Sequence, residues 1–131
     1  MAAPRETFLR GHELVNVAGE SHYQEALRAI AGAAPGPIRV ETTAHLVPEP
    51  ENEYDPNAIR VEIEGQKVGY VPRDLAAAYA PALAPITDRG RVPACEALVA
   101  GREGPDPVLG VFLRLPPPSD DSLREDVARR F

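Results

Sequence analysis

Apolar and polar residues alternate most regularly near the middle of the chain. From residue 59 to residue 64 the order is Ile-Arg-Val-Glu-Ile-Glu, so apolar side chains fall on one face and charged side chains on the other. Gly65 follows, and residues 67–71 run back as a second apolar segment until Pro72. Strict two-residue alternation beside a glycine turn predicts a β-hairpin.

The longest alternating segment is residues 38–47, in which Ile, Val, Thr, Ala and Leu share one face. We expect a strand of this length to bend, because strands in a small closed barrel are tilted and curved. Shorter apolar segments predict further strands at residues 8–17, 93–100 and 108–115. The pattern therefore predicts six strands.

Two segments predict helices, the first by apolar residues at helical spacing and the second by its alanine content. Residues 22–31 form the first, and a Ser-x-x-Gln capping box at residues 21–24 is expected to open it. The second is the alanine-rich segment 74–83, whose end Pro81 and Pro85 are expected to limit. Together with the strands, these helices predict a mainly β domain, a small six-stranded barrel with helical covers.

The chain divides into three parts by composition. We expect residues 1–7 to be a flexible N-terminus and residues 8–115 to form the barrel domain. Residues 116–131 form a proline-led tail, whose opening Pro-Pro-Pro run favours polyproline II. The rest of the tail, residues 119–131, fits either a short helix or a disordered segment.

The composition excludes several classes of protein. At 131 residues and 44% hydrophobic content, the chain can form one core without a metal or a disulfide. Cys95, the single cysteine, lies in an apolar strand and is expected to be a core residue rather than a nucleophile. No apolar run reaches the length of a membrane span and no signal-peptide pattern opens the chain, so we expect a cytoplasmic protein. Without a P-loop, HExxH or zinc spacing, we expect neither an enzyme nor a bound metal or cofactor.

The net charge of −6 limits how the chain can meet nucleic acid. Nonspecific binding to duplex DNA depends mostly on phosphate neutralisation by lysine and arginine, so this chain is not expected to coat a duplex. A short single-stranded end engages few phosphates, and base stacking supplies much of its affinity. Arginine outnumbers lysine thirteen to one.

Two motifs give the chain a family resemblance. The first motif is a Tyr-Asp-x-Asn-Ala-Ile run before the hairpin, together with a Val-Gly-aromatic segment in the second strand of the hairpin. The other motif is a Val-x-Gly segment followed by aromatic residues. Their residues are Tyr54, Asp55, Asn57, Ala58, Ile59, Val68, Gly69 and Tyr70, and upstream Val17, Ala18, Gly19, His22 and Tyr23. In this order and spacing they resemble the HIRAN domain family over roughly residues 10–115. The resemblance implies an OB-like or SH3-like barrel that binds DNA.

The resemblance also implies a pocket that takes the 3′ end of single-stranded DNA. In it, Tyr54 and Tyr70 would stack on the last bases, Asp55 would accept a hydrogen bond from the terminal 3′-hydroxyl, and Asn52 would contact the terminal base. Without the resemblance, the same residues also fit purely structural roles. Tyrosines pack in cores and at rims, and an Asx turn accounts for Asp55 beside Asn57.

The upstream motif adds His22 and Tyr23 to this implied pocket. Ser21 stands where the family carries an arginine, so a phosphate contact or stacking cation is lost. Arg73 and Arg28 are the candidates to replace it. An alternative is that His22 and Tyr23 only pack at the start of a helix, where free N–H groups also favour an anion.

The loop before the hairpin is unusually acidic for a DNA-binding segment. Residues 49–55 carry four carboxylates and no basic residue. A solvated loop or a contact with a basic partner would account for this composition. Oxygen-rich segments also suit calcium, but the spacing lacks the glycine and the distal glutamate of an EF-hand. Two functions therefore compete: a module for single-stranded DNA 3′ ends in repair or stalled-replication processing, with a helicase, nuclease or other repair protein as partner, or a protein-interaction module that has lost DNA-end binding.

Overall fold

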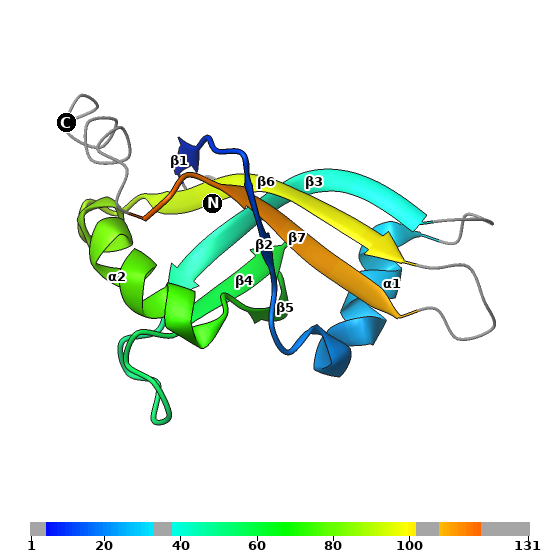
Figure 1. Cartoon of the computed structure of the whole chain (residues 1–131), viewed down its shortest axis with the longest axis horizontal. Helices are drawn as coiled ribbons and strands as arrows, with labels where there is room; N and C mark the ends of the chain where they lie inside the picture. Colours follow the sequence, from blue (N-terminus) through cyan, green and yellow to red (C-terminus); the bar gives the residue numbers. More distant parts are fainter. Residues whose placement is uncertain (1–4, 33–37, 102–107, 119–131) are drawn as a thin grey trace.

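The computed structural model describes residues 5–32, 38–101 and 108–118 (Figure 1). In chain order the elements are β1 (Glu6–Leu9), β2 (Glu13–Asn16), the 3₁₀ helix η1 (Glu20–Tyr23), α1 (Gln24–Ala31), β3 (Ile38–Pro48), β4 (Ile59–Ile63), β5 (Gln66–Tyr70), α2 (Arg73–Asp88), β6 (Val92–Gly101) and β7 (Leu109–Leu115). The predicted mainly β, OB-like fold with two helices is confirmed. Of the tail predicted for residues 116–131, residues 119–131 lie outside the described residues.

All the strands of the described residues join one sheet, in the order β2-β7-β6-β3-β4-β5. Neighbours on this path are antiparallel, and β1 pairs parallel with the first half of β6. α1 and α2 lie at opposite ends of the sheet (Figure 1). Within the described residues, the segment that follows edge strand β2 meets the other edge strand, β5, through an isolated bridge between Ala18 and Tyr70, so the sheet curls without closing into the continuous barrel that the sequence predicted.

The described residues form seven strands, where the sequence predicted six. The segment predicted as one strand over residues 8–17 is split into β1 and β2. Between them the chain crosses the end of β7 so closely that a Cβ on Gly11 would stand 2.0 Å from the Leu115 carbonyl carbon. β1 also begins at Glu6, inside the range predicted to be flexible.

The β4–β5 hairpin and the long strand β3 follow the predicted alternation. Every second residue of β4 is buried, and Glu64 and Gly65 both take positive φ values, 52° and 77°, in the turn. Positive φ at both turn residues matches the right-handed twist of the flanking strands. The hairpin is therefore determined by its own sequence.

α2 is longer than predicted, because it continues through Pro81 and Pro85 to Asp88. Each internal proline removes one backbone hydrogen bond of the helix. The buried face offsets this cost, since its residues recur at spacings of three and four and pack on the sheet; they are Ala76, Tyr79, Leu83 and Ile86. No described helix has both the length and the apolar character of a membrane-spanning segment.

The predicted capping box at residues 21–24 is wrong. The side chain of Gln24 instead reaches β7, where it donates to the Leu109 carbonyl and accepts from the Leu109 N–H, both at 2.8 Å. Glu20 accepts a 3.1 Å hydrogen bond from the Val111 N–H, and burial raises the pKa of this carboxyl although that bond lowers it. Glu20 thus attaches η1 to β7, and Gln24 attaches the start of α1 to the same strand.

Candidate functional site

The loop between β3 and β4 is held by hydrogen bonds among its own residues. The Asn52 side-chain oxygen accepts from the backbone N–H groups of Tyr54 and Asp55, at 2.8 and 3.0 Å. The Ala58 N–H donates to the Asp55 carbonyl at 3.0 Å. These hydrogen bonds hold the backbone of the loop in one conformation, although the Tyr54 ring at its tip is 86% exposed.

Asp55 closes an Asx turn, because its Oδ1 accepts the Asn57 N–H at 2.9 Å. Its Oδ2 makes no hydrogen bond among the described residues and faces Arg73 Nε at 3.7 Å. Arg73 also donates to the Tyr54 carbonyl at 3.4 Å, yet its side chain is 81% exposed. The ion pair is weak because it is long and its guanidinium is exposed to solvent, so the guanidinium is available to an anion.

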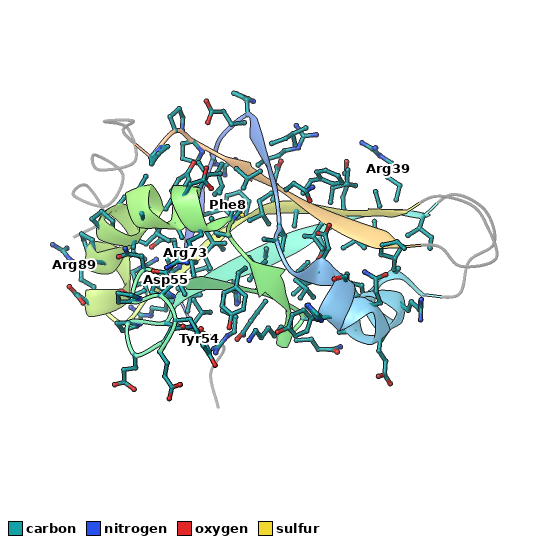
Figure 2. The ribbon with its side chains drawn as sticks, turned by 60° about the horizontal axis from the view of Figure 1, so that its bottom comes forward. Phe8, Arg39, Tyr54, Asp55, Arg73 and Arg89 are labelled. Carbon is teal, nitrogen blue, oxygen red and sulfur yellow. The ribbon has the colours of Figure 1, made fainter. Side chains whose placement is uncertain are left out.

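An open cleft of about 330 Å³ lies beside this loop. Its lining residues come from the loop, from the end of β5 and from the start of α2: Ala18, Asn52, Tyr54, Asp55, Ala58, Tyr70, Val71 and Arg73. Figure 2 shows Tyr54, Asp55 and Arg73 together on one side of the molecule. The cleft thus has an apolar floor of alanine and valine, with aromatic rings, a carboxylate and a guanidinium around it.

Four of the six residues that the sequence singled out line this cleft: Asn52, Tyr54, Asp55 and Tyr70. Of the two arginines considered as replacements, Arg73 lines it and Arg28, in the last turn of α1, does not. His22 and Tyr23 lie in η1 and are not among the lining residues.

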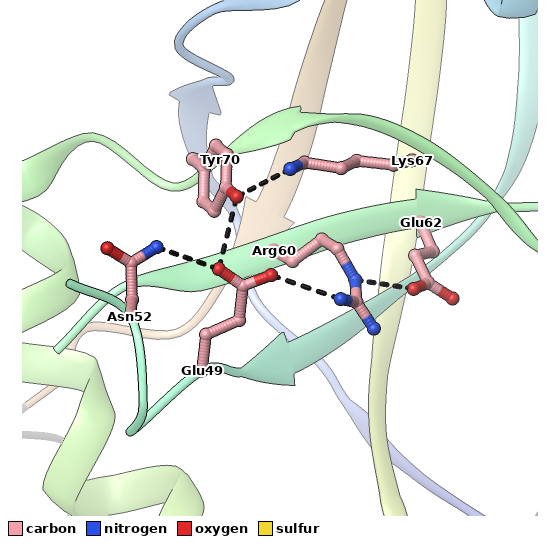
Figure 3. A network of polar contacts seen from close by, with 6 residues as sticks. All are labelled: Glu49, Asn52, Arg60, Glu62, Lys67 and Tyr70. Carbon is pink, nitrogen blue, oxygen red and sulfur yellow. Dashed lines mark hydrogen bonds and ion pairs between the residues drawn. The ribbon is translucent and has the colours of Figure 1, made fainter. Parts of the chain in front are cut away.

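Glu49 anchors a network of polar contacts behind the cleft (Figure 3). Its Oε1 accepts from the Asn52 amide at 2.9 Å and from the Tyr70 hydroxyl at 3.1 Å, and its Oε2 accepts from Arg60 at 3.0 Å. Burial raises the pKa of Glu49, but these hydrogen bonds and the charges of Lys67 and Arg60 outweigh it and hold the pKa below its ordinary value. Glu49 therefore connects the loop to β4 and β5 through hydrogen bonds, and it is not a solvated acid of the loop.

A β-bulge brings Lys67 into the same network. Lys67 and Tyr70 are three residues apart, so a regular strand would point them to opposite faces. The register of β5 against β4 shifts between Val61 and Glu62, so Val68 is the extra residue and both side chains share the outer face. Lys67 then donates a 2.5 Å hydrogen bond to the Tyr70 hydroxyl. Sequence reasoning missed Lys67; only the glycine within this strand, Gly69, pointed to a bulge.

The other candidate chemistries find little support in the structure. Among residues 5–32, 38–101 and 108–118, no group of three His, Cys, Asp or Glu side chains could hold a metal ion. Cys95 is fully buried in β6, and burial raises the pKa of its thiol to about 12. A thiol of this kind stays protonated and is a poor nucleophile.

A match to the profile of a protein family agrees with the two sequence motifs. The sequence profile of the HIRAN domain matches residues 11–103, more than half of the chain. The crystal structure of the HIRAN domain of human HLTF is similar with a TM-score of 0.42 and 20% sequence identity, over 91% of this chain and 88% of that chain. A comparison with curated proteins found no match. The profile match includes both motifs and every residue that lines the cleft.

Proposed function

The chain belongs to the HIRAN domain family, whose members are generally DNA-binding rather than catalytic modules, and from this we propose that it binds the 3′ end of single-stranded DNA in the cleft between Tyr54 and Tyr70. The observation that carries the proposal is the lining of that cleft. Aromatic rings, a carboxylate oxygen without a hydrogen bond and an exposed guanidinium meet there over an apolar floor.

Each of these groups has a role in holding a strand end. Tyr54 stacks on a base, because its ring is exposed and every base has a π-face. Asp55 Oδ2 accepts a hydrogen bond from the terminal 3′-hydroxyl, and the same charge repels a terminal phosphate. Arg73 contacts a backbone phosphate in place of the family arginine that Ser21 replaces.

The acidic residues around the cleft favour an end over a duplex. Glu51 and Glu53 are exposed on the same loop as Tyr54. They repel a long run of phosphates, whereas an end brings only a few phosphates to the cleft. Such selectivity suits a module of DNA repair or stalled-replication processing that works beside a helicase or a nuclease.

Fluorescence anisotropy tests this proposal with a short oligothymidylate labelled at its 5′ end. We expect tighter binding to a 3′-hydroxyl than to a 3′-phosphate at about 50 mM salt, where phosphate contacts are still strong. Asp55→Asn should remove this preference and weaken binding to the hydroxyl end about tenfold. In this variant the side-chain amide oxygen can still accept the hydrogen bond from the Asn57 N–H, so the turn is kept. The NH₂ group replaces Oδ2, so the acceptor for the 3′-hydroxyl is lost.

Glu53→Gln is the matched control, since it makes the same chemical change at an exposed position of the same loop. It should keep the preference for the hydroxyl. Equal binding to both ends by the wild-type protein, or an unchanged preference in Asp55→Asn, would contradict the 3′-end proposal.

A second candidate function is a protein-interaction module with the same fold. The exposed carboxylates Glu51 and Glu53 beside the exposed Tyr54 favour it, because they suit a basic protein surface. This candidate predicts no binding to either oligonucleotide. The anisotropy experiment therefore separates the two functions.

A further inference from the structure

Lys67 lies between two tyrosine rings on the outer face of β5. Its ammonium group is 4.4 Å from the centroid of the Tyr70 ring and 5.5 Å from that of the Tyr23 ring. Tyr70 lines the cleft and Tyr23 does not. Lys67 therefore lies between Tyr70, which lines the cleft, and Tyr23, which belongs to the upstream motif.

The charge of Lys67 is not neutralised by a direct ion pair. Among the described residues, no carboxylate lies within ion-pair distance of its ammonium, which donates a hydrogen bond to the Tyr70 hydroxyl. The nearby carboxylate of Glu49 is already bonded to Arg60, Asn52 and Tyr70. An ammonium group has three N–H donors, and the contacts of Lys67 with Tyr70 and Tyr23 leave one of them for an anion.

We propose that Lys67 binds a backbone phosphate of the strand whose end occupies the cleft, so that the strand continues from Tyr54 past Tyr70 to Tyr23. This inference rests on the proposed function and extends its site across β5. Alternating rings and cations along a path are what a single strand needs, because bases stack on the rings while phosphates meet the cations. Lys67 is only partly buried, so its ammonium can be reached by a phosphate, and the hydrogen bond to Tyr70 holds it in place for this contact.

Lys67→Met tests the proposal, because methionine keeps the length of the side chain without its charge. We expect its affinity for the 3′-hydroxyl oligothymidylate to fall about tenfold. The slope of log affinity against log salt should become shallower by about 0.7, as expected for one lost phosphate contact on a single strand. Arg39→Met is the matched control, because Arg39 is an exposed cation that lies far from Tyr54 and Asp55 in Figure 2. It should leave both quantities nearly unchanged.

Acetylation gives a second measurement, because Lys67 is the single lysine of the chain. Saturating oligothymidylate should slow acetylation of Lys67, read by mass spectrometry, and leave that of the N-terminal amine unchanged. If the wild type prefers the hydroxyl end but Lys67→Met binds like the wild type and Lys67 is not protected, the inference is wrong and the proposed function stands. If the wild type binds neither oligonucleotide, both are wrong.

Discussion

Ala18 and Tyr70 exchange two backbone hydrogen bonds, of 2.7 and 2.9 Å, across the open edges of the sheet. Ala18 belongs to the upstream family motif and Tyr70 to the downstream motif. Their bridge joins residues more than fifty positions apart and brings Ala18 into the wall of the cleft. The two motifs are therefore two halves of one structural unit.

Gly69→Ala should destabilise this unit by about 2 kcal/mol, as overpacking beside a backbone typically does. Gly69 has a φ of 148°, and a Cβ there would stand 2.5 Å from Val17 Cγ1 and 2.6 Å from the Ala18 carbonyl oxygen. Urea denaturation measures the change in the free energy of unfolding. Gly110→Ala is the control, because a Cβ there meets its neighbours at 3.6 Å or more. Equal effects of the two substitutions would show that the close approach to Val17 and Ala18 is unimportant.

Tyr79→Phe should lower the free energy of unfolding by about 1–2 kcal/mol. The buried Tyr79 hydroxyl donates to the Pro116 carbonyl, and burial raises the pKa of this phenol to about 12. Its removal leaves a buried carbonyl without that donor. Tyr54→Phe, at an exposed ring, should have almost no effect on stability in the same denaturation experiment. A stable Tyr79→Phe protein would mean that water or another donor reaches Pro116.

Glu49→Gln should destabilise the protein by about 1–2 kcal/mol near pH 7, because it weakens charge-assisted hydrogen bonds from Arg60 and Tyr70. The pKa of Glu49 is lowered on folding, so its ionised form stabilises the fold above its ordinary pKa of 4.5, and this contribution is lost as the pH falls through the lowered folded value. The difference between wild type and Glu49→Gln should therefore shrink in acid. Denaturation curves over a pH series measure it.

Glu51→Gln provides the control for that series, since Glu51 is exposed on the same loop. It should not change stability near neutral pH. A Glu49→Gln effect that stays constant down to strongly acidic pH would show that the carboxylate charge does not carry the stabilisation.

Cys95 should resist thiol reagents in the folded protein. Its side chain is fully buried, and the rise of its pKa to about 12 keeps the thiol protonated at about pH 8. A colorimetric disulfide reagent should react with one thiol only after a denaturant is added. Fast reaction of the native protein would contradict the buried position of Cys95.

The sequence alone determined the parts of the fold that depend on neighbours along the chain. Alternation in residues 59–64 and the turn at Gly65 specify the hairpin, because each contact within it is local. The same locality is the reason that Asn52, Tyr54 and Asp55 could be assigned to one site, since they lie within four residues of one another. The family was also evident from two short motifs.

The tertiary structure decided what depends on distant segments. The crossing at Gly11 divides a predicted strand in two because β7 lies against it, and the buried face of α2 carries the helix through Pro81 and Pro85. Lys67 joins the polar network of Glu49 and Tyr70 because a bulge within the hairpin turns it to the face of Tyr70, and strict alternation does not predict this register shift. The strand break at Gly11 and the length of α2 depend on packing between segments far apart in sequence, and a pattern of neighbouring residues does not encode such packing.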